Sequence, residues 1–218
     1  MIERIFVFIF GSMVGSFLNV CIYRLPLEES IVLPRSHCPK CKKQIAWYDN
    51  VPFVSYILLG GRCRHCKEKI SFRYFLVELI TALVFLGFYL RFGFSFPYIY
   101  YLILVCALIV ATFVDFAHRI IPDEISLGGI AVGFLINAGR GAQFAPFRYD
   151  WHPALDSLLG IIIGGGIIFS FGYCFDLVYF KLLKRPAIQG ETESMGGGDV
   201  KLLAMIGAFL GWKGALIT

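Results

Sequence analysis

The chain has 218 residues, of which 58% are hydrophobic and only 16% are charged, and its formal net charge is +5. The mean hydropathy of +0.73 excludes a water-soluble domain, because so few charged side chains cannot cover the surface of a protein of this size. Composition therefore predicts a membrane protein.

Six apolar stretches along the chain are predicted to be helices. About 20 mostly apolar residues cross the hydrocarbon core of a bilayer as an α-helix, so the pattern predicts an all-α, polytopic bundle of membrane helices. The stretches are 5–23, 74–90, 98–114, 125–138, 154–180 and 200–217. The first stretch also has features of a secretory signal peptide, because it follows Arg4 and ends near small residues. It outlasts the usual signal core of about 7–15 residues, however, so a membrane helix is the better interpretation.

The positive charge is concentrated in one hydrophilic segment. Ten of the twenty Lys and Arg residues lie between Arg24 and Arg73. Such a patch can attract nucleic acid, but the excess of positive charge on the cytoplasmic loops of membrane proteins accounts for it, and no nucleic-acid partner is predicted. With this segment in the cytoplasm, the amino terminus and the segments 91–97 and 139–152 are predicted outside, and the basic segment 181–199 inside.

Four of the seven cysteines form two pairs within the basic segment. The motif Cys-x-x-Cys-Lys-x-x-Ile-x-aromatic occurs twice, from Cys38 to Trp47 and again from Cys63 to Phe72. Two Cys-x-x-Cys turns supply the four sulfur ligands of a tetrahedral zinc site, so a small cytoplasmic zinc-knuckle domain is predicted. Its predicted ligands are Cys38, Cys41, Cys63 and Cys66.

The predicted metal is structural rather than catalytic, because four thiolates leave no coordination position for a reacting water. A dithiol redox centre and unmodified cysteines are the alternatives for these pairs, whereas paired disulfides are disfavoured in a reducing cytoplasm. The other cysteines, Cys21, Cys106 and Cys174, lie singly in apolar stretches and are interpreted as small core residues.

Two aspartates are predicted to lie at the cytoplasmic ends of membrane helices. Asp115 follows the third apolar stretch, and Asp199 follows three glycines and opens the sixth. Two neighbouring carboxylates do not both ionise readily, so one supplies the base and the other the acid that peptide hydrolysis requires. The glycines let backbone and substrate approach the aspartate closely. Two structural roles stay open from the residues alone: Asp199 as a helix N-cap, and Asp115 as the ion-pair partner of Arg119.

The remaining polar residues of the membrane region have mostly structural interpretations. Asp123, which follows Pro122, is typical of a first helical turn. His118 is interpreted as a surface residue, and Asp176 as a source of a hydrogen bond between helices. Glu78 lies near the start of the second stretch, where the cost of burying a carboxyl group makes it a functional candidate.

Taken in order, these motifs resemble those of the type IV prepilin peptidases, the bifunctional leader peptidases and N-methyltransferases of pilus and type II secretion systems. The resemblance covers nearly the whole chain. It rests on Gly-Ser-Phe-Leu-Asn-Val at 15–20, Tyr-Arg-Leu-Pro at 23–26, the two cysteine pairs, Trp-Tyr-Asp-Asn-Val-Pro at 47–52, Ser-Phe-Arg-Tyr at 71–74, Val-Glu at 77–78, Asp115, Ile-Pro-Asp at 121–123, Gly-Gly-Gly-Asp at 196–199 and Lys-Leu-Leu-Ala at 201–204.

This resemblance implies a membrane aspartic endopeptidase that removes the basic leader from prepilins or pseudopilins at the cytoplasmic face of the bacterial inner membrane. Asp115 and Asp199 match the catalytic aspartates of the family. The resemblance also implies methyl transfer from S-adenosylmethionine to the new amino terminus, in the cytoplasmic portion of the enzyme. No residue of the sequence identifies the site of that cofactor.

The resemblance further implies that the chain is divided into three parts. A first membrane helix occupies 1–23, a zinc-binding cytoplasmic domain with the methyltransferase part occupies 24–73, and a membrane peptidase domain occupies 74–218. Family members usually continue through further membrane helices after the position of Trp212, so the chain is expected to be truncated at Thr218.

Two functions of other classes are also compatible with parts of the sequence. An ion-coupled transporter would use Asp115, Asp176 and Asp199 as an ion pathway, but the intramembrane carboxylates are too scattered to form polar faces along several helices. A quinone-coupled thiol oxidoreductase would use the two cysteine pairs, but such disulfide exchange normally takes place on the oxidising side of a membrane.

Overall fold

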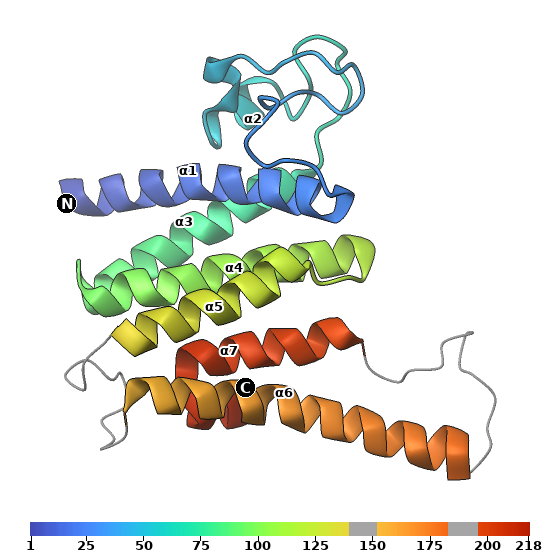
Figure 1. The fold of residues 1–218 in the computed structure, drawn as a ribbon. Helices are drawn as coiled ribbons and strands as arrows, with labels where there is room; N and C mark the ends of the chain where they lie inside the picture. Colours follow the sequence, from blue (N-terminus) through green and yellow to red (C-terminus); the bar gives the residue numbers. More distant parts are fainter. Residues whose placement is uncertain (140–151, 183–195) are drawn as a thin grey trace. The chain divides into compact units, whose positions relative to one another are not determined.

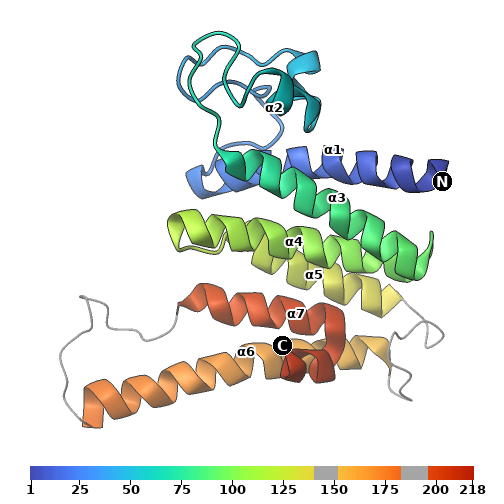
Figure 2. The ribbon, with the colours of Figure 1, turned by 180° about the vertical axis from the view of Figure 1, so that it is seen from behind.

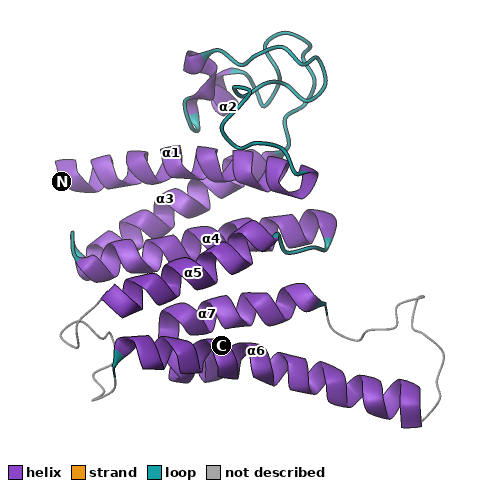
Figure 3. Ribbon diagram, viewed as in Figure 1, coloured by secondary structure: helices purple, strands orange, loops and turns teal. Residues whose placement is uncertain are grey.

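The computed structural model describes residues 1–139, 152–182 and 196–218, and within these ranges the chain forms helices and loops without a β-strand (Figure 3). The chain divides into two compact units, Met1–Arg119 and Ile120–Thr218. The predicted all-α fold with a small cysteine-rich domain is confirmed.

Three long helices build the first unit: α1 (Ile2–Arg24), α3 (Phe72–Phe92) and α4 (Phe96–His118). Helix α3 starts beside the C-terminal end of α1 and returns along it, as both ribbon views show (Figures 1 and 2). The hydrophilic segment 25–71 connects these two helix ends. It contains only short helical turns, which are η1 (Leu25–Leu27), η2 (Trp47–Asn50) and α2 (Val54–Leu58).

Two glycines of α1 lie directly against α3. A Cβ atom added to Gly11 would lie 2.8 Å from the Cβ of Phe85, and one added to Gly15 would lie 2.7 Å from the Cα of Glu78. Small residues four apart let the backbones of membrane helices approach closely, which strengthens van der Waals packing. The spacing of these glycines is the sequence signal for the contact, and it brings Glu78 next to α1.

The second unit contains α5 (Asp123–Gly139), α6 (Pro153–Asp176) and α7 (Gly197–Ile217), and α6 continues into the π-helical turn η4 (Leu177–Leu182). Its tightest contact again uses glycine. Gly160 of α6 and Gly207 of α7 face each other so closely that a Cβ atom on either would overlap the carbonyl oxygen of the other.

A kink divides α7 at Gly211, whose φ of 72° lies in the left-handed region that glycine adopts without strain. The kink interrupts the helical hydrogen-bond ladder near Ala208. The Ala208 carbonyl instead accepts bonds from Asn137 Nδ2 at 2.9 Å and from Ser157 Oγ at 2.7 Å. Both polar side chains are buried, so these bonds join α5 and α6 to the bend of α7 in an apolar setting where a lost partner would be costly.

Five of the described helices are long and apolar enough to cross a membrane: α1, α3, α4, α6 and α7. Helix α5 has 17 residues, or about 25 Å of helix against a hydrocarbon core of about 30 Å. The structure thus supports five of the six predicted spans by length. The predicted order of loops inside and outside the cell requires α5 to cross the membrane as well, and this order stays a prediction. The loop regions 140–151 and 183–195 lie outside the described residues.

The contact between Gly160 and Gly207 predicts a large difference between two identical substitutions in α6. Gly160→Leu should lower the midpoint of thermal unfolding in detergent, because an overpacked helix contact costs about 1–3 kcal/mol or more. Gly166→Leu is the matched control, since a Cβ atom at that position meets nothing within 4 Å. Equal unfolding midpoints for the two variants would contradict the close approach of α6 and α7.

Candidate metal centre and aspartate site

The cysteine repeat of the sequence is also a repeat of backbone geometry. In the first motif, Lys42 N–H donates to the Cys38 carbonyl at 2.9 Å, and Cys38 N–H donates to the Lys43 carbonyl at 3.0 Å. Lys42 has a φ of 57°, so the turn closes in the left-handed region. The same two bonds recur 25 residues later, at 3.0 and 2.9 Å, with a φ of 58° at the equivalent lysine; the residues are Cys63, Lys67 and Glu68. Each motif therefore folds as one knuckle.

The two knuckles bring four sulfur atoms together. The Sγ atoms of Cys38, Cys41, Cys63 and Cys66 all lie within 4.8 Å of one another. The Cys38 and Cys66 sulfurs are 3.8 Å apart. A tetrahedral site with metal–sulfur bonds of about 2.3 Å has sulfur–sulfur edges of about 3.8 Å, so the cluster has the dimensions of a four-thiolate metal site.

The thiols of the second knuckle titrate in opposite directions. Backbone N–H groups of Cys66 and His65 lower the pKa of the Cys63 thiol to about 7. At Cys66 the N–H of Glu68 also lowers the pKa, but desolvation and the neighbouring thiols outweigh it and raise the pKa to about 11. Four sulfurs this close do not all ionise without a cation between them, and the thiolate is the form that binds a metal.

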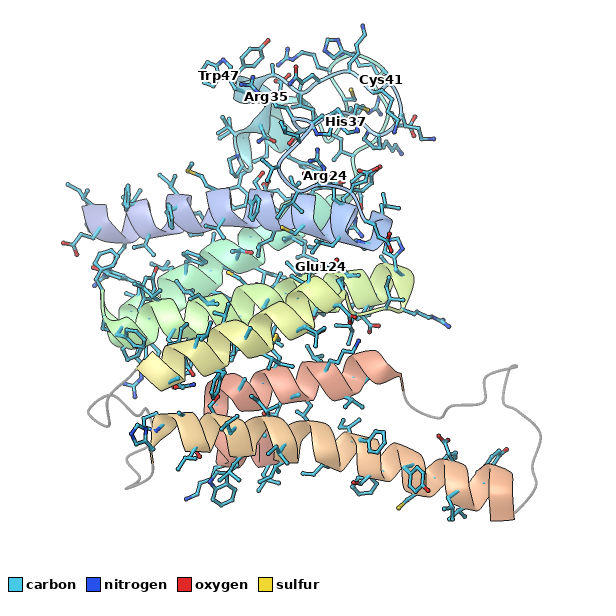
Figure 4. All side chains as sticks on the ribbon, in the orientation of Figure 1. Arg24, Arg35, His37, Cys41, Trp47 and Glu124 are labelled. Carbon is cyan, nitrogen blue, oxygen red and sulfur yellow. The ribbon has the colours of Figure 1, made fainter. Side chains whose placement is uncertain are left out.

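The segment 25–71 has few buried residues to stabilise it. Only Cys38, Ser55 and Gly61 are buried in it, so it has no hydrophobic core of its own. Arg24, buried at the end of α1, holds the start of the segment through bonds from Nη1 to the Ser30 carbonyl at 2.8 Å and from Nη2 to the carbonyl of Pro34 at 2.6 Å. Figure 4 shows Arg24 at the base of the segment and Cys41 far from it.

An ion pair joins the second knuckle to the residues that follow the first knuckle. Arg64 donates from Nε and Nη2 to the two carboxylate oxygens of Asp49, at 2.7 and 2.6 Å. The hydrogen bond and charge of Arg64 lower the pKa of the Asp49 carboxyl below its usual value. This planar, two-point pairing fixes the second knuckle against the residues that follow the first.

Asp115 lies in the last turn of α4, and its side chain is exposed. The helix ends at Arg119, which adopts a φ of 56° and donates its backbone N–H to the Asp115 carbonyl at 2.7 Å. No ion pair between the two side chains occurs in the part of the chain that the structure describes, so the structural alternative for Asp115 has no support.

Asp199 is the third residue of α7, and its side chain is exposed. The N-cap position belongs to Gly196, so Asp199 is not the N-cap that the sequence left open. A carboxylate in a first turn is favoured by the exposed N–H groups of the helix start. Gly198 lies against Ile121, because a Cβ atom there would meet the Ile121 Cβ at 3.1 Å.

Asp123 opens α5, as predicted for a first-turn residue, and it also has a partner that the sequence did not reveal. Lys201 Nζ lies 2.6 Å from Asp123 Oδ1, which connects the start of α5 to the start of α7. His118 is exposed, as predicted.

Asp115 belongs to the first unit and Asp199 to the second, so the pairing of these two aspartates stays a prediction.

A cavity of about 440 Å³ lies within the first unit, between the segment 25–71 and the adjoining ends of α1 and α3. Glu78 and Asn19 contribute buried polar groups to its wall. The sequence singled out Glu78 as a costly carboxyl group, but Asn19 entered only as part of a motif. The spacing of Gly11 and Gly15 on α1 is the sequence signal that indicates the proximity of Asn19 and Glu78.

Long apolar helices define this chain as a multi-pass membrane protein, and its four-cysteine segment has the sulfur geometry of a metal site. Residues 9–92 match the bacterial peptidase A24 N-terminal domain, and residues 102–218 match the type IV leader peptidase family. The chain belongs to the type IV leader peptidase family. The resemblance to this family that the sequence indicated is confirmed.

Relatives in three bacteria are named prepilin leader peptidase/N-methyltransferase. That of Myxococcus xanthus is 40% identical over 97% of this chain, which spans 57% of the relative's length. Those of Pseudomonas aeruginosa and Aeromonas salmonicida are 35% and 33% identical over 93% and 95% of this chain, which spans 71% and 73% of their lengths. No solved structure matches the chain significantly. These relationships favour a peptidase over the transporter and oxidoreductase interpretations.

Proposed function

We propose that the protein is an aspartic endopeptidase of the bacterial inner membrane that cleaves the basic leader from type IV prepilins or pseudopilins. The supporting observation is the position of two aspartates at helix ends within a chain of the leader peptidase family. Asp115 lies in the last turn of α4 and Asp199 in the first turn of α7, and both side chains are exposed.

The chemistry requires two carboxyl groups in different protonation states. One carboxylate takes a proton from water while the water oxygen attacks the scissile carbonyl carbon. The other, protonated carboxyl group gives its proton to the amide nitrogen as the carbon–nitrogen bond breaks. The products are a carboxylic acid on the leader and a free amine on the pilin, and the pair shares one proton before and after the reaction.

Covalent geometry supports the pairing of these aspartates. Five residues separate Asp115 from Ile121, so their Cα atoms lie within about 22 Å of each other whatever the path of the chain. In the second unit Ile121 lies against Gly198, the residue before Asp199. Within the second unit, the Lys201–Asp123 ion pair also joins the start of α5 to the start of α7.

We further propose that Cys38, Cys41, Cys63 and Cys66 bind one structural zinc ion and that the enzyme methylates the new amino terminus with S-adenosylmethionine. The zinc ion supplies the stability that the segment 25–71 cannot gain from burial. Ten basic residues between Arg24 and Arg73 favour the cytoplasmic side for this segment. Substrates with a helix in the same membrane would present their basic leader on that side.

A reaction with purified substrate tests the proposal. Membranes containing the protein are incubated with a synthetic prepilin and labelled S-adenosylmethionine, and the products are identified by mass spectrometry. The expected products are a shortened pilin and a shortened pilin with one added methyl group. Cleavage without methylation would limit the function to a peptidase, and an unchanged prepilin would contradict the proposal.

A further inference from the structure

We propose that the cavity of the first unit binds the methyl donor, with the Glu78 carboxylate and the Asn19 amide oxygen facing its positive charge. This inference rests on the proposed methyltransferase activity and assigns it a site. The donor, S-adenosylmethionine, carries a sulfonium ion, an amino acid group and an adenine ring. Its recognition therefore requires negative or polar acceptors next to apolar and aromatic surface.

The first argument is an acceptor without a donor. Asn19 is only 4% exposed, and its Nδ2 group donates to the Tyr74 carbonyl at 2.9 Å. This bond orients the amide, but its Oδ1 atom has no hydrogen-bond partner. A buried polar atom without a partner costs about 1–3 kcal/mol, so a ligand that supplies a donor or a positive charge would be stabilised here.

The second argument is a carboxyl group without a cation. Glu78 is 9% exposed, lies where Gly15 brings α1 against α3, and accepts a bond from the Phe53 N–H at 3.1 Å. Residues 1–139 are described without a gap, and no ion pair in them involves Glu78. An ionised carboxylate in such a place is expensive unless a positive group pairs with it.

Among the basic residues of the cavity wall, Arg73 has a buried Nε atom without a hydrogen-bond partner, and no ion pair joins it to Glu78. Arg24 binds the Ser30 and Pro34 carbonyls, and Arg64 is paired with Asp49. No basic side chain of residues 1–139 forms an ion pair with Glu78, so a ligand is expected to supply its positive partner.

Aromatic side chains form the third argument. Five aromatic rings line the cavity: Tyr23, Phe53, Tyr56, Tyr74 and Phe75. Three of them form a cluster, in which the Phe53 and Phe75 rings are 5.4 Å apart and the Tyr56 and Phe75 rings 5.6 Å apart. Aromatic faces attract organic cations and stack against planar rings, and both groups occur in S-adenosylmethionine. The volume lies within the usual range of about 300–1,000 Å³ for small-molecule sites.

The reaction at this site would conserve atoms and electrons. The amine nitrogen of the pilin forms a bond to the methyl carbon, while the sulfur keeps the electron pair of the broken carbon–sulfur bond and becomes a neutral thioether. The methylated nitrogen then loses a proton. The product, S-adenosylhomocysteine, lacks the sulfonium charge, so a site that recognises this charge binds the donor more tightly than the product.

Glu78→Gln tests the inference, because glutamine keeps the shape and can still accept the Phe53 N–H bond but loses the charge. Isothermal titration of the zinc-loaded protein in detergent should show S-adenosylmethionine binding weakened by about tenfold or more. Binding of S-adenosylhomocysteine should change by less than about threefold, since only the sulfonium distinguishes the two ligands. Glu3→Gln is the matched control, because Glu3 pairs with Tyr89 at the opposite end of the same helix pair.

The outcomes separate this inference from the function on which it rests. If the wild-type protein does not bind S-adenosylmethionine, the methyltransferase proposal itself is wrong. If wild type and Glu78→Gln bind it equally, the methyltransferase proposal stands and this site is wrong. A higher KM for an already cleaved pilin with unchanged donor binding would mean that Glu78 holds the pilin ammonium instead, which also overturns the donor site.

A measurement on the wild-type protein covers the case in which the variants do not fold. Ultraviolet crosslinking of labelled S-adenosylmethionine, followed by peptide mapping, should place the label within residues 16–78, which contain the cavity wall. Excess S-adenosylhomocysteine should prevent the labelling. A label confined to residues 120–218 would overturn the inference.

Discussion

Asp115→Asn and Asp199→Asn are each expected to abolish prepilin cleavage, with a loss of at least about 10²–10⁴-fold in the rate of the chemical step. Neither a lone carboxylate nor a lone carboxylic acid performs both proton transfers of peptide hydrolysis. The double variant Asp115→Asn/Asp199→Asn should therefore be scarcely slower than either single variant, because residues that act as one unit give non-additive losses. Cleavage rates on a synthetic prepilin, at matched amounts of membrane-inserted protein, provide the measurement.

Two other aspartates are suitable controls for this experiment. Asp123→Asn breaks the ion pair to Lys201, whose side chains are 57% and 38% exposed, and such surface pairs contribute only about 0–1 kcal/mol. Asp176→Asn changes a residue at the end of α6 for which we predict a packing role. Both variants should retain substantial activity. Full proteolysis by Asp199→Asn would remove the case for an aspartate pair.

The same inactive variants separate the two proposed activities. Methyl transfer is assigned to the first unit and uses neither aspartate, so Asp115→Asn and Asp199→Asn should still methylate a pilin supplied in its cleaved form. Loss of both activities in a variant that is present in the membrane at normal levels would show that the two sites depend on each other.

Removal of zinc should unfold the segment 25–71 and leave the membrane helices in place. Binding of structural zinc contributes about 10–16 kcal/mol in zinc-finger peptides, and this segment has only three buried residues with which to replace it. We expect about one zinc per chain by metal analysis. Chelation or Cys63→Ser should cause rapid hydrogen exchange in the segment, with α1, α3 and α4 still protected.

Cys174→Ser provides the matched control for that substitution. Cys174 is an exposed residue of α6 outside the sulfur cluster, so its replacement should change neither the zinc content nor hydrogen exchange in the segment. A reduced preparation, made without chelators, that contains no zinc would count against the metal centre.

Features that depend only on neighbouring residues could be predicted from the amino-acid sequence. Apolar stretches of about 20 residues predict membrane helices because the bilayer core sets their length. The repeated cysteine motif predicts two knuckles because each one closes within six residues, and the structure shows the same hydrogen bonds in both, 25 residues apart. The order of the motifs was sufficient to identify the family.

Contacts between residues far apart in the sequence became visible only in the folded chain. The Asn19 amide group donates to the carbonyl of Tyr74, 55 residues later, and this bond leaves its oxygen without a partner. The Ala208 carbonyl accepts bonds from Asn137 and Ser157, which lie 71 and 51 residues before it. The ion pair of Lys201 with Asp123 likewise crosses 78 residues. Glycines let helices approach within van der Waals distance, but the hydrophobic periodicity of one helix does not identify the helix that packs against it. Helix packing therefore placed Glu78 and Asn19 in one cavity, whereas the sequence placed them only in separate motifs.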